Sequence, residues 1–146
     1  ITYFLRIGSL AIVGILFLAL AVSLATWYLR GRNTGPDQPL PDIGAGEFAD
    51  FLGSGKPGII EFYTDTCHWC ALLEPELAEV RAKYGGKLLV AKMNAQNHYT
   101  LATRYSVRVV PTMIFFNRSG NVQSTIEGFM EAGDIVKLIE SMGIAR

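Results

Sequence analysis

The chain has 146 residues, half of them hydrophobic, and its 13 basic and 13 acidic side chains leave no net charge. A chain of this length holds one domain of ordinary size with room for one membrane span. The absence of a basic excess argues against nucleic acid as a partner. A zinc site usually takes four ligands, and the chain has one cysteine pair and only His68 and His98 to supply them, so zinc is disfavoured and no metal and no cofactor are expected.

The first predicted element is a membrane-spanning helix within residues 1–30. No charged residue lies between Arg6 and Arg30, and the 23 residues in between would form a helix about 34 Å long, enough to cross a hydrocarbon core of about 30 Å. Aromatic side chains suited to the membrane interfaces lie near both ends: Tyr3, Trp27 and Tyr28. A cleavable signal peptide is the alternative, but its apolar region would be shorter. We therefore predict a single-pass membrane protein with the lipid bilayer as a partner.

Residues 31–43 contain three prolines and are predicted to form a semi-rigid linker, followed by one domain over residues 44–146. Within that domain, runs of β-branched and aromatic residues predict strands, and apolar residues at helical spacing predict helices. The expected strands cover 58–64, 88–93, 113–116 and 122–127, and the expected helices cover 47–52, 68–84, 99–105 and 132–142. Strands that alternate with helices indicate an α/β fold, with a mixed sheet of about four strands flanked by helices.

The two cysteines frame a Cys67-His68-Trp69-Cys70 sequence where the strand over 58–64 gives way to a helix. Cys67 would lie at the helix N-terminus, where unpaired backbone N–H groups and the helix dipole stabilise a thiolate. Cys70, one turn into the helix, is expected to be more buried. Thiol–disulfide exchange needs an exposed attacking thiolate and a neighbouring thiol that resolves the mixed disulfide. We therefore predict that Cys67 attacks and that Cys70 resolves.

Three other uses of the cysteine pair are less favoured. A zinc site would need both histidines of the chain, His68 and His98, beside the one cysteine pair, and haem attachment would need a histidine directly after the second cysteine, where Ala71 stands. A purely structural disulfide would close so small a loop that it would stabilise the fold only weakly. A redox centre is therefore the favoured interpretation.

Further residues resemble the thioredoxin family over about residues 45–143. Four matching features stand at the family's spacing: Pro75 five residues after the second cysteine, Lys92 within Val-Ala-Lys-Met-Asn, the cis-proline loop Val110-Pro111-Thr112, and Gly128 after the last strand. The resemblance implies a thioredoxin-like fold in which the backbone of Val110 pairs with a substrate strand and Pro111 packs beside the cysteines. A proline at a strand entrance suits a cis turn; the alternative is that Pro111 only begins a strand.

Glu61, six residues before Cys67, matches the family's buried acid, which takes part in proton transfer to and from the inner cysteine. The family usually has Asp there, so the longer Glu is a departure. We expect Glu61 and Lys92 to tune this proton transfer together. The alternative is that Glu61 is an ordinary solvated strand residue, since a single buried carboxylate near a site is only a probabilistic indication of function.

His68 and Trp69 replace the Gly-Pro pair that reducing members of the family usually carry. A protonated His68 would favour the Cys67 thiolate, whereas Trp69 would offer an apolar contact to a substrate or a docking partner. These replacements alter thiolate stabilisation and hence the reduction potential, whose value the sequence leaves open. The family's first strand is missing or reduced to residues 41–43.

The first functional hypothesis is a membrane-anchored thioredoxin-like protein-disulfide reductase. Its partners would be disulfide-containing proteins outside the cytoplasm, such as apocytochromes during maturation, and a membrane or soluble dithiol that supplies electrons. A second hypothesis reverses the flow of electrons to disulfide oxidation or isomerisation. A third makes the chain an accessory subunit of a larger membrane complex, with the domain as a docking surface.

Two arguments conflict over the side of the membrane on which the domain lies. Arg6 before the span against Arg30 and Arg32 after it would place the domain in the cytoplasm. Basic residues preceding Ile1 would change that count. A dithiol domain held at a membrane serves substrates across it, because the cytosol has soluble reductants. We therefore expect the domain to be extracytoplasmic, that is, periplasmic or lumenal.

Overall fold

The computed structural model describes residues 2–31, 35 and 37–145, and the side chains of residues 14–28, 35 and 37–145. The chain divides into two compact units, Ile1–Asn33 and Thr34–Arg146. Each unit is considered by itself.

The first unit is a single helix, α1 (Thr2–Gly31), so the helix predicted for this region is present. Trp27 and Tyr28 are exposed, whereas Tyr3 and residues 7–13 and 29 of the predicted span lie outside the described side chains. Within the part of the chain that the structure describes, no helix combines the length and the apolar character that crossing a membrane requires. The membrane span stays a prediction.

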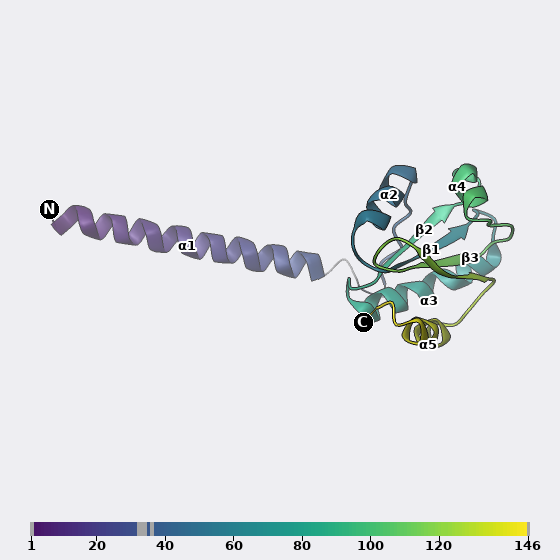
Figure 1. Ribbon diagram of the computed structural model, residues 1–146. Coiled ribbons are helices and arrows are strands. Elements are labelled where there is room, and N and C mark those ends of the chain that lie inside the picture. The colour runs from purple at the N-terminus through teal and green to yellow at the C-terminus, as the bar shows by residue number, and fades with distance from the viewer. Residues whose placement is uncertain (1, 32–34, 36, 146) are drawn as a thin grey trace. The chain divides into compact units, whose positions relative to one another are not determined.

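The second unit is built on a four-stranded mixed sheet with the order β2-β1-β3-β4 (Figure 1). Strand β1 pairs in parallel with β2 and antiparallel with β3, which pairs antiparallel with β4. The strands are β1 (Gly58–Tyr63), β2 (Leu89–Asn94), β3 (Thr112–Phe116) and β4 (Val122–Glu127), and the helices are α2 (Ala45–Gly53), α3 (His68–Tyr84), α4 (Tyr99–Arg104) and α5 (Ala132–Met142). All eight predicted elements of the domain are confirmed, with shifts of a residue or two at their ends.

Helices cover both faces of the sheet, with α3 and α5 on one side and α2 and α4 on the other (Figure 1). Successive side chains of a strand point to opposite faces. Ile59 of β1 packs with α3 and α5, whereas Ile60 and Phe62 pack with α2 and α4. Glu61, two residues after Ile59, therefore belongs to the face that α3 covers. This alternation brings a carboxyl group beneath the helix that carries the cysteines.

Residues 37–43, which we call the strap, pass Arg81 near the carboxyl end of α3 and then pair with the outer edge of β2 through residues 41–43. Ile43 donates to the Lys92 carbonyl and Lys92 donates to the Pro41 carbonyl, both at 2.9 Å, and Asp42 forms an isolated parallel bridge with Lys92. Leu40 is only 3% exposed and belongs to the core between the sheet and α3. Residues 41–43, which were predicted to end the linker, thus form a shortened counterpart of the family's first strand. This agrees with the prediction that the first strand is missing or shortened to these residues.

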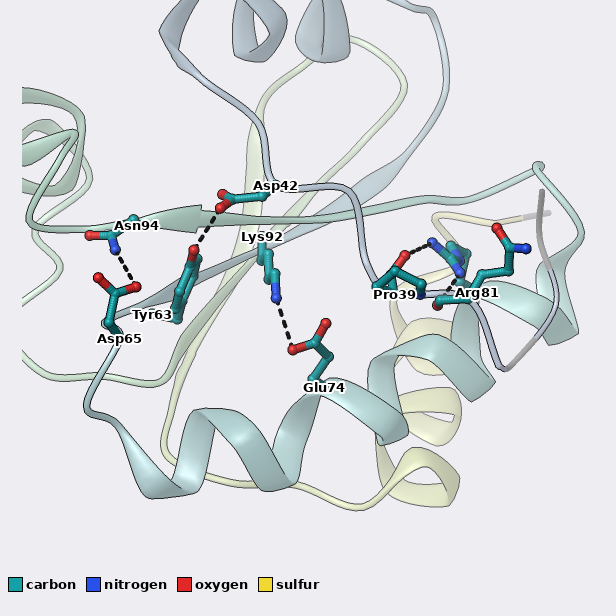
Figure 2. Close-up of polar contacts among 9 residues, drawn as sticks. Pro39, Asp42, Tyr63, Asp65, Glu74, Arg81, Lys92 and Asn94 are labelled. Atoms are coloured by element: carbon teal, nitrogen blue, oxygen red, sulfur yellow. Dashed lines mark hydrogen bonds and ion pairs between the residues drawn. The ribbon is translucent and has the colours of Figure 1, made fainter.

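Arg81, near the carboxyl end of α3, holds the strap to the domain (Figure 2). Its side chain is only 7% exposed. The guanidinium donates to the carbonyls of Pro39 at 3.0 Å, Gln38 at 2.6 Å and Gly35 at 3.2 Å. A planar guanidinium with five donors suits such a cluster of carbonyl oxygens. One buried cation therefore ties the start of the second unit to α3.

Candidate active site

The two cysteines form a disulfide at the N-terminus of α3. Cys67 is the N-cap residue, and its Sγ accepts a hydrogen bond from the Cys70 backbone N–H at 3.1 Å. Cys67 is half-buried and Cys70 is 5% exposed, so the predicted difference in burial is confirmed. A thiolate formed at Cys67 would meet the unpaired N–H groups of the first helical turn. The sulfur that reaches solvent is thus also the one that the helix stabilises as an anion.

A cavity of about 290 Å³ opens beside the disulfide. It brings together both cysteines and four charged side chains: Glu61 from β1, Asp65 from the loop before α3, Glu74 from α3 and Lys92 from β2. Glu61 and Lys92 are direct partners in the register of β1 and β2. Among the described side chains, no group of three His, Cys, Asp or Glu residues could hold a metal ion. The sequence predicted Glu61 and Lys92 for this site but did not predict Glu74.

Glu61 is buried, with 1% of its surface exposed, so the alternative of a solvated strand residue is wrong. Burial in a poorly hydrated environment, together with the negative charge of Glu74, raises the pKa of Glu61 to about 8, although the Lys92 charge opposes the shift. Glu61 Oε1 has no hydrogen-bond partner among the described residues. A carboxyl group in this state can both accept and donate a proton near neutral pH, which is the property required of a proton-transfer group.

Lys92 lies on β2, and its side chain reaches toward α3, which covers this face of the sheet. Its Nζ donates to Glu74 Oε2 at 2.8 Å and lies 5.1 Å from the centre of the Tyr63 ring (Figure 2). Glu74 follows Cys70 by four residues, so both side chains lie on one face of α3. That helical spacing is the signal that could have revealed Glu74 from the sequence.

Two side-chain hydrogen bonds fix the rim of the cavity (Figure 2). The Tyr63 hydroxyl donates to Asp42 Oδ2 at 2.6 Å, and Asn94 Nδ2 donates to Asp65 Oδ1 at 3.0 Å. Burial of the phenol and the hydrogen bond to Asp42 raise the pKa of Tyr63 to about 12, so Tyr63 stays neutral in the physiological range. The strap is therefore joined to the active site through Asp42.

The proline loop contains the expected cis peptide bond between Val110 and Pro111. Pro111 is buried and Val110 half-buried. The Pro111 carbonyl accepts from the Gly128 N–H at 2.8 Å, and the ring of the next residue, Phe129, lies 6.1 Å from that of Trp69. The loop is thus linked through residues 128 and 129 to the helix that begins at the disulfide.

His68 and Trp69, between the cysteines, are both exposed. The Trp69 side chain is 57% exposed, and its ring lies 5.9 Å from that of His68. An exposed aromatic surface beside a reactive sulfur suits contact with an unfolded or extended polypeptide. The substrate-binding roles of His68, Trp69, Val110 and Pro111 stay predictions.

Comparison with known proteins agrees with the fold and the site. The sequence profile described as thioredoxin matches residues 42–141. The chain belongs to the thioredoxin family and carries the redox-active pair of that family at Cys67 and Cys70.

Individual relatives are similar over the domain. Thioredoxin Y, chloroplastic, of Oryza sativa subsp. japonica is 34% identical over 88 residues, which make up 60% of this chain and 52% of that protein. The chain thus spans about half the length of the rice relative. Thioredoxin of Acidithiobacillus ferridurans is 28% identical over 92 residues, or 63% of this chain and 84% of that one. The solved structure of a mutant thioredoxin from Halobacterium salinarum NRC-1 superposes with a TM-score of 0.65 at 30% identity, covering 74% of this chain and 93% of that one.

Proposed function

We propose that this protein is a membrane-anchored thiol–disulfide oxidoreductase that reduces disulfides of proteins outside the cytoplasm, apocytochromes among them. The observation that carries the redox part is the asymmetric pair at the start of α3. Cys67 reaches the surface, whereas Cys70 is buried beside a cavity that holds Glu61. That arrangement supplies an attacking sulfur, a resolving sulfur and a proton-transfer group.

Reduction would proceed in two balanced steps. The Cys67 thiolate attacks one sulfur of the substrate disulfide, forms a mixed disulfide and expels the other substrate sulfur as a thiolate. The Cys70 thiol then gives its proton to the Glu61 carboxylate and attacks Cys67 Sγ. The second substrate sulfur leaves, and the Cys67–Cys70 disulfide forms. Two electrons have passed to the substrate, and a dithiol donor returns the pair to its reduced form.

The test is turnover of insulin disulfides by the full chain in lipid nanodiscs, with dithiothreitol as the electron donor. We expect the unmodified protein to accelerate reduction, and we expect Cys67→Ser to lower the rate at least about a hundredfold, because a serine hydroxyl cannot replace the thiolate. Oxidation of a reduced protein substrate, measured in parallel, covers the opposite direction of electron flow. Turnover in that assay alone would favour the oxidase or isomerase. Folded protein inactive in both assays would favour the accessory subunit of a membrane complex.

The membrane part of the proposal is supported by the sequence of α1. The 23 residues between Arg6 and Arg30 carry no charge, and they lie within one continuous helix. This part of the proposal rests on the sequence, in which an uncharged apolar run of 23 residues has the length needed for a bilayer core of about 30 Å. The extracytoplasmic position is supported by the chemistry of the site, because a reductase held at a membrane reaches substrates that soluble cytosolic dithiols do not.

An accessibility measurement tests the side of the membrane. We expect a membrane-impermeant maleimide, added to intact cells whose outer membrane is permeabilised where one exists, to label reduced Cys67. Cys67→Ser serves as the control for labelling of Cys70, which is buried. Labelling that requires lysis of the inner membrane, with the dithiol shown to be reduced beforehand, would place the domain in the cytoplasm, as Arg30 and Arg32 suggest.

A further inference from the structure

The lysine of the active site is held by a carboxylate other than the proton-transfer group. Glu61 and Lys92 are direct neighbours in the register of β1 and β2, so their side chains leave the same face of the sheet. Lys92 Nζ nevertheless donates to Glu74 Oε2 at 2.8 Å, whereas Glu61 Oε1 has no hydrogen-bond partner among the described residues. The cation is therefore engaged by α3 and not by its neighbour in the sheet.

Ionisable groups approach this lysine from every element packed around it. Strand β1 contributes Glu61 and Tyr63, helix α3 contributes Glu74 and the two cysteines, the strap contributes Asp42 through its bond to Tyr63, and the loop before α3 contributes Asp65 through Asn94. Of these groups, only Glu74 forms an ion pair with Lys92. Glu74 is 31% exposed and Lys92 18%, so solvent only partly screens the pair.

We propose that Glu74 is a positioning residue that sets the charge state of the proton-transfer group at the dithiol: by holding the Lys92 ammonium on α3, it keeps Glu61 in the acid form, which can return a proton to Cys70 but must lose its own proton before it can accept one. The inference rests on the thiol–disulfide exchange proposed above and assigns a third side chain to it. In the second step of reduction the Cys70 proton passes to the Glu61 carboxylate, and in the reverse reaction the same proton returns.

Removal of the Glu74 charge would act on Glu61 in two ways, both with the same sign. A negative neighbour that disfavours the Glu61 carboxylate would be lost, and Lys92 would be free to approach the carboxylate and stabilise it. Both effects lower the pKa of Glu61 from about 8. At pH 7 the ionised fraction of Glu61 would rise from about one tenth to about one half if the titration midpoint fell by one pH unit. Since the carboxylate is the form that accepts the Cys70 proton, resolution of the mixed disulfide would accelerate about fivefold at pH 7.

The first measurement is a titration of the Glu61 carboxyl carbon by NMR in the oxidised full chain, labelled with ¹³C at Glu. The resonance is assigned by its loss in Glu61→Gln. We expect Glu74→Gln to lower the midpoint of Glu61 by about one pH unit or more. Glu74→Asp, which keeps the charge, should shift the midpoint by less than half as much. Glu79→Gln, an exposed position on the same helix, serves as the matched control and should leave the midpoint unchanged. An unchanged midpoint in Glu74→Gln would overturn the proposal.

The second measurement is the rate at which a preformed mixed disulfide on Cys67 is resolved between pH 5 and 9. We expect Glu74→Gln to raise this rate about fivefold at pH 7 and to have no effect in a Glu61→Gln background, because the influence passes through Glu61. An equal effect in both backgrounds, or none in either, would overturn the proposal. The NMR titration requires no activity, so a chain that exchanges no thiols yet shows the expected midpoint shift would refute the proposed function while confirming the electrostatic role of Glu74.

Discussion

Replacement of Cys70 by serine is expected to convert the protein into a trap that retains its substrates on Cys67. Cys67 can still attack, because it is only half-buried and lies at the N-terminus of α3, but no second thiol remains to expel the substrate. The mixed disulfide, a transient intermediate during turnover, should become the main species once substrate is in excess. Non-reducing electrophoresis and mass spectrometry of the full chain, recovered from cells that express it, would measure the adduct and identify the bound proteins.

The reciprocal variant tests the assignment of roles. In Cys67→Ser the remaining thiol, Cys70, is 5% exposed, so protein substrates should not reach it. Adducts that form on Cys70 in the Cys67→Ser variant, but do not form on Cys67 in the Cys70→Ser variant, would reverse the assignment. Apocytochromes or other extracytoplasmic proteins among the adducts would support the substrate class that we propose.

Replacement of Arg81 by alanine is expected to release the strap from the domain. The guanidinium supplies the three hydrogen bonds that hold the carbonyls of Gly35, Gln38 and Pro39. A hydrogen bond from a charged donor contributes roughly 1.5–3 kcal/mol, so the loss of even one should increase local opening about tenfold to a hundredfold. Hydrogen exchange followed by mass spectrometry should show this loss of protection in peptides that cover residues 37–43.

Lys83→Ala is the matched control, since Lys83 is a basic residue in the last turn of the same helix but is exposed. Its strap peptides should exchange as in the unmodified protein. The β3 peptides should stay protected in both variants, which separates release of the strap from global unfolding. Equal protection of the strap in the Arg81 and Lys83 variants would show that the buried guanidinium does not hold it.

The sequence was sufficient for those parts of the site that depend on local order. The apolar run before Cys67 and the helical spacing after Cys70 predict a strand that leads into a helix, and this junction alone places the dithiol at a helix N-terminus. The cis bond before Pro111 was likewise expected from a proline at a strand entrance. These features arise from neighbours in the chain, for which periodicity and turn chemistry are informative.

The remaining parts of the site depend on which segments meet across the sheet. The burial of Glu61 could not be decided from its own strand, because a carboxylate in an apolar run fits either a solvated or a buried position. The partner of Lys92 was missed for a related reason: Glu74 approaches it only because β2 lies next to β1 under α3. The burial of Arg81 depends on the strap, whose carbonyls it binds and which lies about 40 residues earlier in the chain. The proline-rich composition of residues 31–43 predicts a stiff segment, but it does not predict that this segment binds to α3.

The unequal exposure of the two sulfurs has a consequence for the order of events in catalysis. Because Cys70 is enclosed by the domain, the Sγ atom of Cys67 would be the point at which electrons enter and leave the pair in the proposed reaction. In the proposed reductase, the dithiol donor and the disulfide substrate would therefore use the same site on the protein and exclude each other. Such a protein works by alternation, in the ping-pong manner, with each partner released before the other arrives. Where donor and substrate share a compartment, they compete for this site. The concentration of the donor then sets both the rate at which the disulfide is reduced again and the fraction of time for which the site is open to substrate.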